Sequence, residues 1–316
     1  RAVVDLDLGL DLNNVDDTLD VEVNIDLDAA SLHANTLNLD VTDISGKLRF
    51  TREQGFTGRG LKAYFYDQPL AIDIGPSAND LLDSPLFAGR FAAQVSGENA
   101  LAWADLALAL PIVGSAELVA EVAVDETAKV RLSSTLAGMQ IDMPAPVGKT
   151  AAQNAPITVA FDVDADAPIN VFWQGRLTGR GYRRAGELVG GVLDVTPRSS
   201  PFELSEPSIT EGFYLTGYIP SLDVDQWLAA FNTRDFYSHA EKRSTALTIE
   251  ALAFDRVRFG GADIGALNVD LKPFDGWDML GLNADWLDAE LTLLHGDGGA
   301  DLIINTLDLD RLPKLG

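Results

Sequence analysis

The chain has 316 residues, of which 47% are hydrophobic and 22% are charged, and this composition excludes a disordered acidic tail. Its length allows one large all-β domain or two average domains. The 48 acidic and 23 basic residues give a formal net charge of −25, which repels nucleic-acid phosphates and anionic lipid headgroups, so we expect no nucleic-acid partner.

Near-strict alternation of apolar and acidic residues begins at Val4 and runs to Leu12. A period of two predicts a β-strand, because successive side chains point to opposite faces of the ribbon. Each such strand has one apolar face and one anionic face. The same alternation returns at residues 21–28, 37–41, 161–164, 267–271 and 307–310.

Turn-forming residues separate the strand-like segments about every ten residues, which favours an antiparallel or meandering sheet over strands that alternate with long helices. The best helix candidate is residues 221–231, where Asp223 is placed to cap the N-terminus and Trp227, Leu228 and Phe231 lie on one stripe. The most loop-like stretch is residues 196–208, with three prolines and four serines.

These patterns predict an all-β fold, either an elongated, strongly twisted antiparallel or meandering sheet or a β-sandwich, with one or two short helices. We expect a single segment over residues 1–316, with one weak candidate boundary at residues 196–208. The chain starts at Arg1 without a signal peptide, and the strand pattern is already under way at Val4, so we expect an internal segment of a longer protein.

Residues that could carry chemistry are sparse or badly spaced. The chain has no cysteine, so a disulfide, a thiolate metal site and a cysteine nucleophile are excluded. Residues 162–166 have the opening spacing of a calcium loop, but alanine stands at its sixth position and tryptophan at its twelfth. His33, His239 and His295 lie far apart. We therefore expect no enzyme activity, no metal site and no cofactor.

Four arginines cluster within residues 176–184 of this anionic chain: Arg176, Arg180, Arg183 and Arg184. A salt-bridged hairpin tip and an anion-binding patch both explain such a cluster. No run approaches the roughly 18 apolar residues that a membrane-spanning helix requires.

Three segments, in order along the chain, resemble the AsmA-like family of Gram-negative envelope proteins, and in particular its YhdP subgroup. The first is residues 131–149, a strand followed by Met143-Pro144-Ala145-Pro146-Val147-Gly148-Lys149. The second is residues 217–228, which contain Gly217-Tyr218-Ile219-Pro220 and Leu222-Asp223-Val224-Asp225-Gln226-Trp227. The third runs from residue 254 to residue 312 and closes with Leu307-Asp308-Leu309-Asp310.

The resemblance implies a bridge-like lipid-transfer protein, anchored in the inner membrane and crossing the periplasm towards the outer membrane. It implies a sheet curled into an open hydrophobic groove that holds phospholipid acyl chains, at roughly 0.8 kcal/mol for each CH₂ removed from water. Inner- and outer-membrane components would be contacted by parts of the protein outside this chain. We expect the chain to be periplasmic and to act in intermembrane phospholipid transport without catalysis.

The apolar members of the alternating strands are the candidate groove residues. They are Leu6, Leu8, Leu10, Val21, Val23, Ile25, Leu37, Leu39, Leu106, Leu108, Val159, Phe161, Leu267, Val269, Leu291, Leu293, Ile304 and Leu307. A structural or adhesion β-sandwich, or a scaffold module of the cell envelope, remains the alternative, because either arrangement uses one apolar face per strand.

Overall fold

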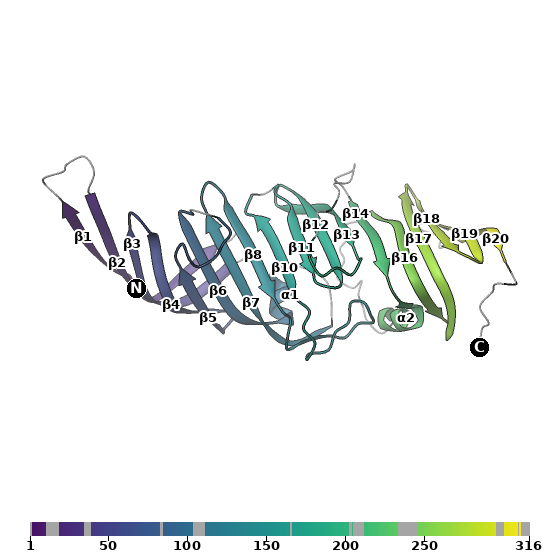
Figure 1. Ribbon diagram of the computed structural model, residues 1–316, viewed down its shortest axis with the longest axis horizontal. Coiled ribbons are helices and arrows are strands. Elements are labelled where there is room, and N and C mark those ends of the chain that lie inside the picture. The colour runs from purple at the N-terminus through teal and green to yellow at the C-terminus, as the bar shows by residue number, and fades with distance from the viewer. Residues whose placement is uncertain are drawn as a thin grey trace. The chain divides into compact units, whose positions relative to one another are not determined.

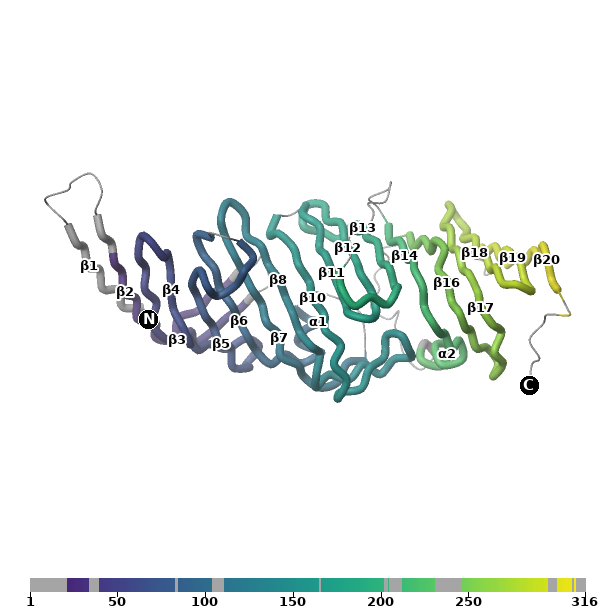
Figure 2. Tube along the Cα trace, viewed as in Figure 1, coloured from purple at the N-terminus to yellow at the C-terminus, as the bar shows by residue number. Residues whose placement is uncertain are grey.

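A computed structural model of the chain is shown in Figures 1 and 2. It describes residues 2–10, 19–34, 39–82, 85–103, 111–164, 166–201, 204, 212–232, 246–294, 300–308 and 310. Strands account for 67% of the structure, and the described ranges contain two short helices. The predicted all-β class, with an open sheet and one or two short helices, is confirmed.

The chain divides into two compact units. Unit 1 comprises Arg1–Leu106, Val113–Met139 and Thr158–Asp164. Unit 2 comprises Ala107–Ile112, Gln140–Ile157 and Ala165–Gly316.

In unit 1 the strands β1 to β8 pair antiparallel, each with the next along the chain, and β10 pairs with β8. The helix α1 (Gly97–Trp103) follows β6. The strands are β1 (Ala2–Leu10), β2 (Leu19–Ala34), β3 (Leu39–Thr51), β4 (Gly55–Phe65), β5 (Gln68–Ile74), β6 (Phe87–Ser96), β7 (Ile112–Val124), β8 (Ala128–Ser134) and β10 (Ile157–Asp162). The short β9 (Met139–Ile141) is bridged to Lys149 through Ile141.

Unit 2 combines antiparallel and parallel pairing. Its antiparallel pairs are β11–β12–β13 and β16–β17–β18–β19–β20. Figure 1 shows β16 and β17 side by side. The strands are β11 (Ile169–Trp173), β12 (Leu177–Arg184), β13 (Glu187–Asp194), β14 (Gly212–Ile219), β15 (Leu222–Asp223), β16 (Leu247–Phe259), β17 (Ala262–Phe274), β18 (Trp277–Ala284), β19 (Leu287–Leu294) and β20 (Ala300–Leu307).

The parallel pairs β13–β14, β14–β16 and β15–β16 depart from a simple meander. Parallel neighbours need a long crossover connection, because the chain must return to the same end of the sheet before the next strand starts. The segments of the chain between β13 and β14 and between β14 and β16 are long enough for such connections. Within the candidate boundary at residues 196–208, residues 202–203 and 205–208 lie outside the described residues, and the described ones belong to unit 2.

Several hairpins close through two residues, as their backbone conformations require. Tyr66 and Asp67 both have positive φ between paired residues Phe65 and Gln68, which is the arrangement of a type I′ turn. The β16–β17 hairpin closes in the same way on residues 260–261, where two glycines adopt positive φ without steric cost.

The helix α2 (Val224–Asn232) begins where the sequence predicts it. Asp223 caps the helix, since its Oδ1 accepts the backbone N–H of Gln226 at 3.0 Å. Its Oδ2 accepts from the Gln226 side chain at 2.9 Å. The predicted apolar stripe is displaced, however, because Leu228 is exposed and Val224 makes the contact with the apolar cluster of unit 2.

Candidate functional site

One face of the unit 1 sheet is apolar, and we call it the unit 1 apolar face. Its buried cluster is formed by alternate residues of β3 to β6: Val41, Leu61, Ala63, Phe65, Leu70, Ile72, Ala93 and Val95. Leu27 of β2 and Leu48 of β3 pack against this cluster from one side and Leu118 of β7 from the other. The face therefore spans strands β2 to β7 of the sheet.

The alternation of β2 is visible in the burial of its side chains. Val23, Ile25 and Leu27 are half-buried, whereas Asn24 and Asp26 are exposed. The register pairs Val23 with Phe50 and Ile25 with Leu48, so the apolar residues of neighbouring strands share one face. The opposite face, which we call the unit 1 polar face, carries the charged residues of β2 and β3.

The unit 2 apolar face contains the second buried cluster, formed by Ile219, Leu252, Phe254 and Val257. Leu215 and Ile249 pack against it, and each is paired with the other in the β14–β16 register. Leu267 and Val269 extend the cluster onto β17, and the register continues it to further apolar pairs. These pairs are Val269–Leu282, Leu271–Leu280 and Leu280–Leu291.

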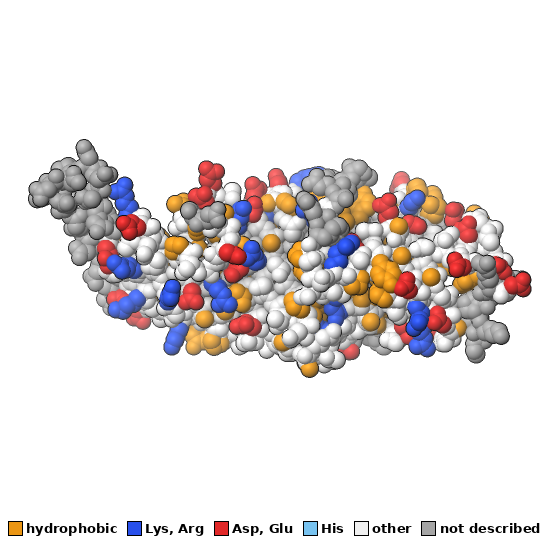
Figure 3. Space-filling model, in the orientation of Figure 1, with side chains coloured by type: hydrophobic (Ala, Val, Ile, Leu, Met, Phe, Trp, Pro, Cys, Tyr) orange, Lys and Arg blue, Asp and Glu red, His pale blue; other side chains and the backbone are white. Residues whose placement is uncertain are grey.

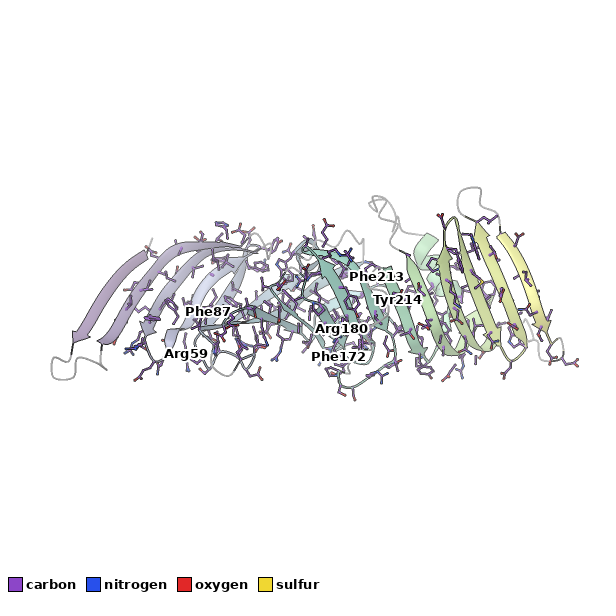
Figure 4. The ribbon with its side chains drawn as sticks, turned by 90° about the horizontal axis from the view of Figure 1, so that it is seen from above. Arg59, Phe87, Phe172, Arg180, Phe213 and Tyr214 are labelled. Atoms are coloured by element: carbon purple, nitrogen blue, oxygen red, sulfur yellow. The ribbon has the colours of Figure 1, made fainter. Side chains whose placement is uncertain are left out.

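Towards β11 the same face has a floor of glycines. A Cβ built on Gly179 would lie 2.7 Å from Leu193 Cδ2, and one on Gly181 would lie 2.7 Å from Leu188 Cδ1. The two leucine side chains of β13 therefore lie across the backbone of β12, in space that a side chain at either glycine would occupy. On β14, the register places Phe213 on the face of Leu193 and the next residue, Tyr214, on the opposite face. Figure 4 labels both residues.

This glycine-floored region is only partly covered. Leu188 is 47% exposed, Leu193 is 36% exposed and Leu247, which is paired with Phe213, is 43% exposed. Exposed large apolar side chains that gather on one face are a feature of binding surfaces. The surrounding positions on this face are also apolar: Ile169, Val171, Phe213, Leu215 and Ile249.

A short helix covers part of the apolar face in each unit. In unit 1, Ala100 and Trp103 of α1 pack against the buried cluster. In unit 2, Val224 of α2 does so. The Asp225 carboxylate ties α2 to the β16–β17 turn, because it accepts the backbone N–H groups of Gly260 and Gly261 at 3.0 Å each. These two hydrogen bonds hold the pKa of Asp225 below its ordinary value, and the bond from Gly260 has the larger effect.

A turn at residues 142–150 is held by two side chains of unit 2, one between β11 and β12 and one on α2. Arg176, which stacks on Trp173 at 4.7 Å, donates to the Pro146 carbonyl and, at 3.0 Å, to the Gly148 carbonyl. Trp227 of α2 donates its Nε1–H to the Ala145 carbonyl at 2.9 Å. Two segments on which the family resemblance rests are thereby joined, and the turn helps to position α2.

Contacts in this turn also explain two unusual cations. Lys149 is buried and donates to the Thr150 carbonyl at 2.9 Å, and burial, followed by the nearby Arg176 charge, lowers its pKa. Burial also lowers the pKa of Arg176. Other members of the arginine cluster bind neutral oxygens, Arg180 that of the Asn170 side chain and Arg183 the Ala167 carbonyl. Arg176, Arg180 and Arg183 therefore brace the sheet around β11 and β12.

A family model described as YhdP protein matches residues 1–314 of the chain. The chain belongs to the YhdP family. The resemblance to the AsmA-like proteins of the YhdP subgroup is confirmed, and with it the assignment to the cell envelope. A search of curated proteins and a search of solved structures each found no match.

The YhdP family is not known as a family of enzymes. Within the described ranges of this YhdP chain, no group of three or more histidine, aspartate or glutamate side chains is arranged to hold a metal ion. None of the helices in those ranges has the length and apolar character needed to cross a membrane.

The candidate groove residues of this YhdP chain fall into three groups. Leu37, Leu106 and Leu108 lie outside the described residues. For five others the structure gives the strand but not the side chain: Leu6, Leu8, Leu10, Val21 and Leu39. The β1–β2 register pairs Leu6 with Val23 and Leu8 with Val21.

The remaining candidates are described with their side chains. In unit 1, Val23 and Ile25 of β2 and Val159 and Phe161 of β10 are half-buried. In unit 2, the half-buried residues are Leu267, Val269, Leu291 and Leu293. Ile304 and Leu307 of β20 are exposed.

The sequence prediction missed the residues of the glycine-floored region, namely Leu188, Leu193, Phe213 and Leu247. Strands β12 and β13 do not alternate between apolar and acidic residues, because glycines occupy several of their positions. The signal that could have found them is the spacing of Gly179, Gly181 and Gly191. Residues two apart on a strand share a face, so a glycine stripe there predicts a floor over which neighbouring side chains lie.

Proposed function

We propose that this chain is a non-enzymatic lipid-transfer segment whose apolar faces bind the acyl chains of phospholipids. The observation that carries the proposal is the exposed apolar surface around Leu188, Leu193 and Leu247 on the unit 2 apolar face. Leaving three large apolar side chains this exposed is unfavourable in water, and an acyl chain laid across them would remove that cost. The candidate groove residues of unit 1 are proposed to contribute to the unit 1 apolar face, and those of unit 2 to the unit 2 apolar face.

The polar face supports the proposal by keeping such a protein in solution. The exposed side chains of β2 on that face are acidic or amide groups, and the formal net charge of the chain is −25. Family membership supports a role in the periplasm, with phospholipid moving between the inner and outer membranes. Apolar contacts have no directional requirement, so they suit a ligand that must slide and not stay fixed.

The competing function is a structural sandwich of the cell envelope. A sandwich covers the apolar face of one sheet with the apolar face of a second sheet. Within the described part of each unit, the element that packs on the apolar cluster from outside the sheet is a short helix, α1 or α2. This arrangement favours the lipid-binding function.

The test is lipid extraction and native mass spectrometry of the purified chain. We expect phospholipid to co-purify with the wild-type chain and to be lost from the double variant Leu188→Asp with Leu193→Asp. A carboxylate there would meet an acyl chain without a partner, at a cost of several kcal/mol. The matched control is Asn268→Asp, an exposed residue between Leu267 and Val269 whose side chain points to the opposite face.

Retention of lipid by Asn268→Asp together with its loss from the double variant supports the proposal. A wild-type chain free of lipid after gentle purification contradicts it, as does a double variant that keeps its lipid. The unit 1 apolar face is tested with the double variant Val23→Asp with Ile25→Asp. The purified variant should lose its bound lipid, and the same variant should block lipid passage in cells.

A further inference from the structure

The β3–β4 hairpin carries an unusual concentration of positive charge. Residues 47–62 contain five of the 23 basic residues of the chain and a single acidic residue, Glu53. The basic residues are Lys47, Arg49, Arg52, Arg59 and Lys62. Figure 3 shows several Lys and Arg side chains over this part of unit 1, with Asp and Glu side chains between them. In a chain with a formal net charge of −25, such a region indicates a specific role.

A depression of about 480 Å³ lies at the centre of this region, where β2, β3 and β4 run side by side. Three consecutive residues of each strand line it: residues 24–26, 47–49 and 57–59.

The lining places the depression on the unit 1 polar face. The middle residues Ile25 and Leu48 point their side chains to the apolar face, and Gly58 has none, so these three provide the floor through their backbones. The flanking side chains alternate to the other side of the sheet and form a rim. The rim consists of Asn24, Asp26, Lys47, Arg49, Thr57 and Arg59.

The rim is cationic, and its charges are unequally compensated. Arg49 is paired with Glu22 at 2.8 Å, and Glu22 also accepts from the Asn24 side chain at 3.2 Å. Lys47 lies 3.5 Å from Asp26, but both side chains are mostly exposed, so this pair is weak. The Thr57 hydroxyl donates to the Arg49 carbonyl at 3.3 Å. The Arg59 side chain, labelled in Figure 4, makes no ion pair or hydrogen bond with the residues that the structure describes.

We infer that this depression binds a phosphate group, carried either by a small soluble molecule or by a lipid headgroup. Planar guanidinium groups match the geometry of phosphate oxygens, and Lys47 would add a third cation. The volume is in the range of small-molecule sites and exceeds what inorganic phosphate alone requires. The site lies on the unit 1 polar face, opposite the unit 1 apolar face, so it is independent of the acyl-chain binding proposed above.

The test is a titration of the full chain, followed by amide chemical shifts, with inorganic phosphate and with glycerol 3-phosphate at low salt. A second measurement is flotation with phosphatidylcholine vesicles, with and without phosphatidylglycerol. The variant is Arg59→Gln, and the matched control is Arg52→Gln. Arg52 is exposed in the turn of the same hairpin and does not line the depression, so the control changes the net charge equally.

We expect Arg59→Gln to weaken glycerol 3-phosphate binding about tenfold, which is the typical effect of losing one charge-assisted hydrogen bond. We expect Arg52→Gln to change binding by less than about twofold, because general electrostatic attraction contributes little once a site makes direct contacts. Binding of the soluble ester without flotation identifies a soluble ligand. Flotation that requires phosphatidylglycerol and Arg59 identifies a headgroup.

Three results would overturn the inference: a wild-type chain that binds neither probe, equal weakening by both variants, or binding that neither variant changes. An unaltered circular dichroism spectrum of Arg59→Gln establishes that the variant is folded. Loss of phosphate binding with retained acyl-chain binding, or the reverse, separates this site from the proposed lipid-binding function.

Discussion

Leucine-to-alanine substitutions in unit 2 measure whether its apolar face is uncovered in solution. Leu252 is 5% exposed within the buried cluster, and Leu193 is 36% exposed over the glycine floor. Truncation of a buried leucine costs about 2–5 kcal/mol. Full burial of a leucine side chain contributes about 1.5–3 kcal/mol, so the covered two thirds of Leu193 contribute about 1–2 kcal/mol.

The two variants are compared by urea unfolding, followed by tryptophan fluorescence. Four of the five tryptophans lie in unit 2, so the signal reports mainly on that unit. If the slope is about 3 kcal/mol per M urea, a difference of about 2 kcal/mol separates the midpoints by about 0.7 M. We expect Leu252→Ala to have the lower midpoint.

Equal midpoints for Leu193→Ala and Leu252→Ala would refute this reasoning. That result would mean that Leu193 is as fully packed in solution as the cluster residue, and that another layer covers the unit 2 apolar face. The lipid-binding proposal would then lose the observation on which it rests, and the sandwich would become the better interpretation.

Two further predictions concern the attachment of α2 and of the turn at residues 142–150. The Asp225 pKa is lowered by the Gly260 and Gly261 amides, so its contribution to stability is present above the unfolded pKa near 3.8 and is lost as the pH falls through the folded value. The Gly260 and Gly261 amide shifts should report this loss as the pH falls below 3.8, and Asp225→Asn should abolish that pH dependence. Arg176→Gln should destabilise unit 2 by about 1–3 kcal/mol in urea unfolding, since two partly buried carbonyls lose their donor. An unchanged midpoint would mean that water replaces the guanidinium at no cost.

Alternation in the sequence was sufficient to predict the strands in which it occurs, such as β2, and their two faces. For Val23, Asn24, Ile25 and Asp26, hydropathy alone gives the correct side of β2, because a period of two leaves only two choices. The cap of α2 at Asp223 was also predictable, since capping depends on residues close in sequence.

Long-range features could not be predicted in the same way. The parallel placement of β14 between β13 and β16 depends on contacts across long connections, and nothing local in β14 distinguishes a parallel from an antiparallel neighbour. The role of Arg176 was equally hidden, because its partners Pro146 and Gly148 lie about thirty residues earlier in the chain. The arginine cluster could be noticed but not interpreted.

The glycines of β12 connect the sheet to the proposed function. On a sheet face built only from large apolar residues, the side chains would stand side by side and cover the backbone. Gly179 and Gly181 instead leave space in which Leu188 and Leu193 lie flat on the backbone of β12. The floor is then low, apolar and still about 40% exposed at the two leucines. A surface of this kind offers many equivalent contacts and no fixed polar anchor, so the energy of an acyl chain changes little as it moves along the face. For that reason we expect lipid occupancy to depend on the space that Gly179 and Gly181 leave above β12 more than on the identity of any one leucine.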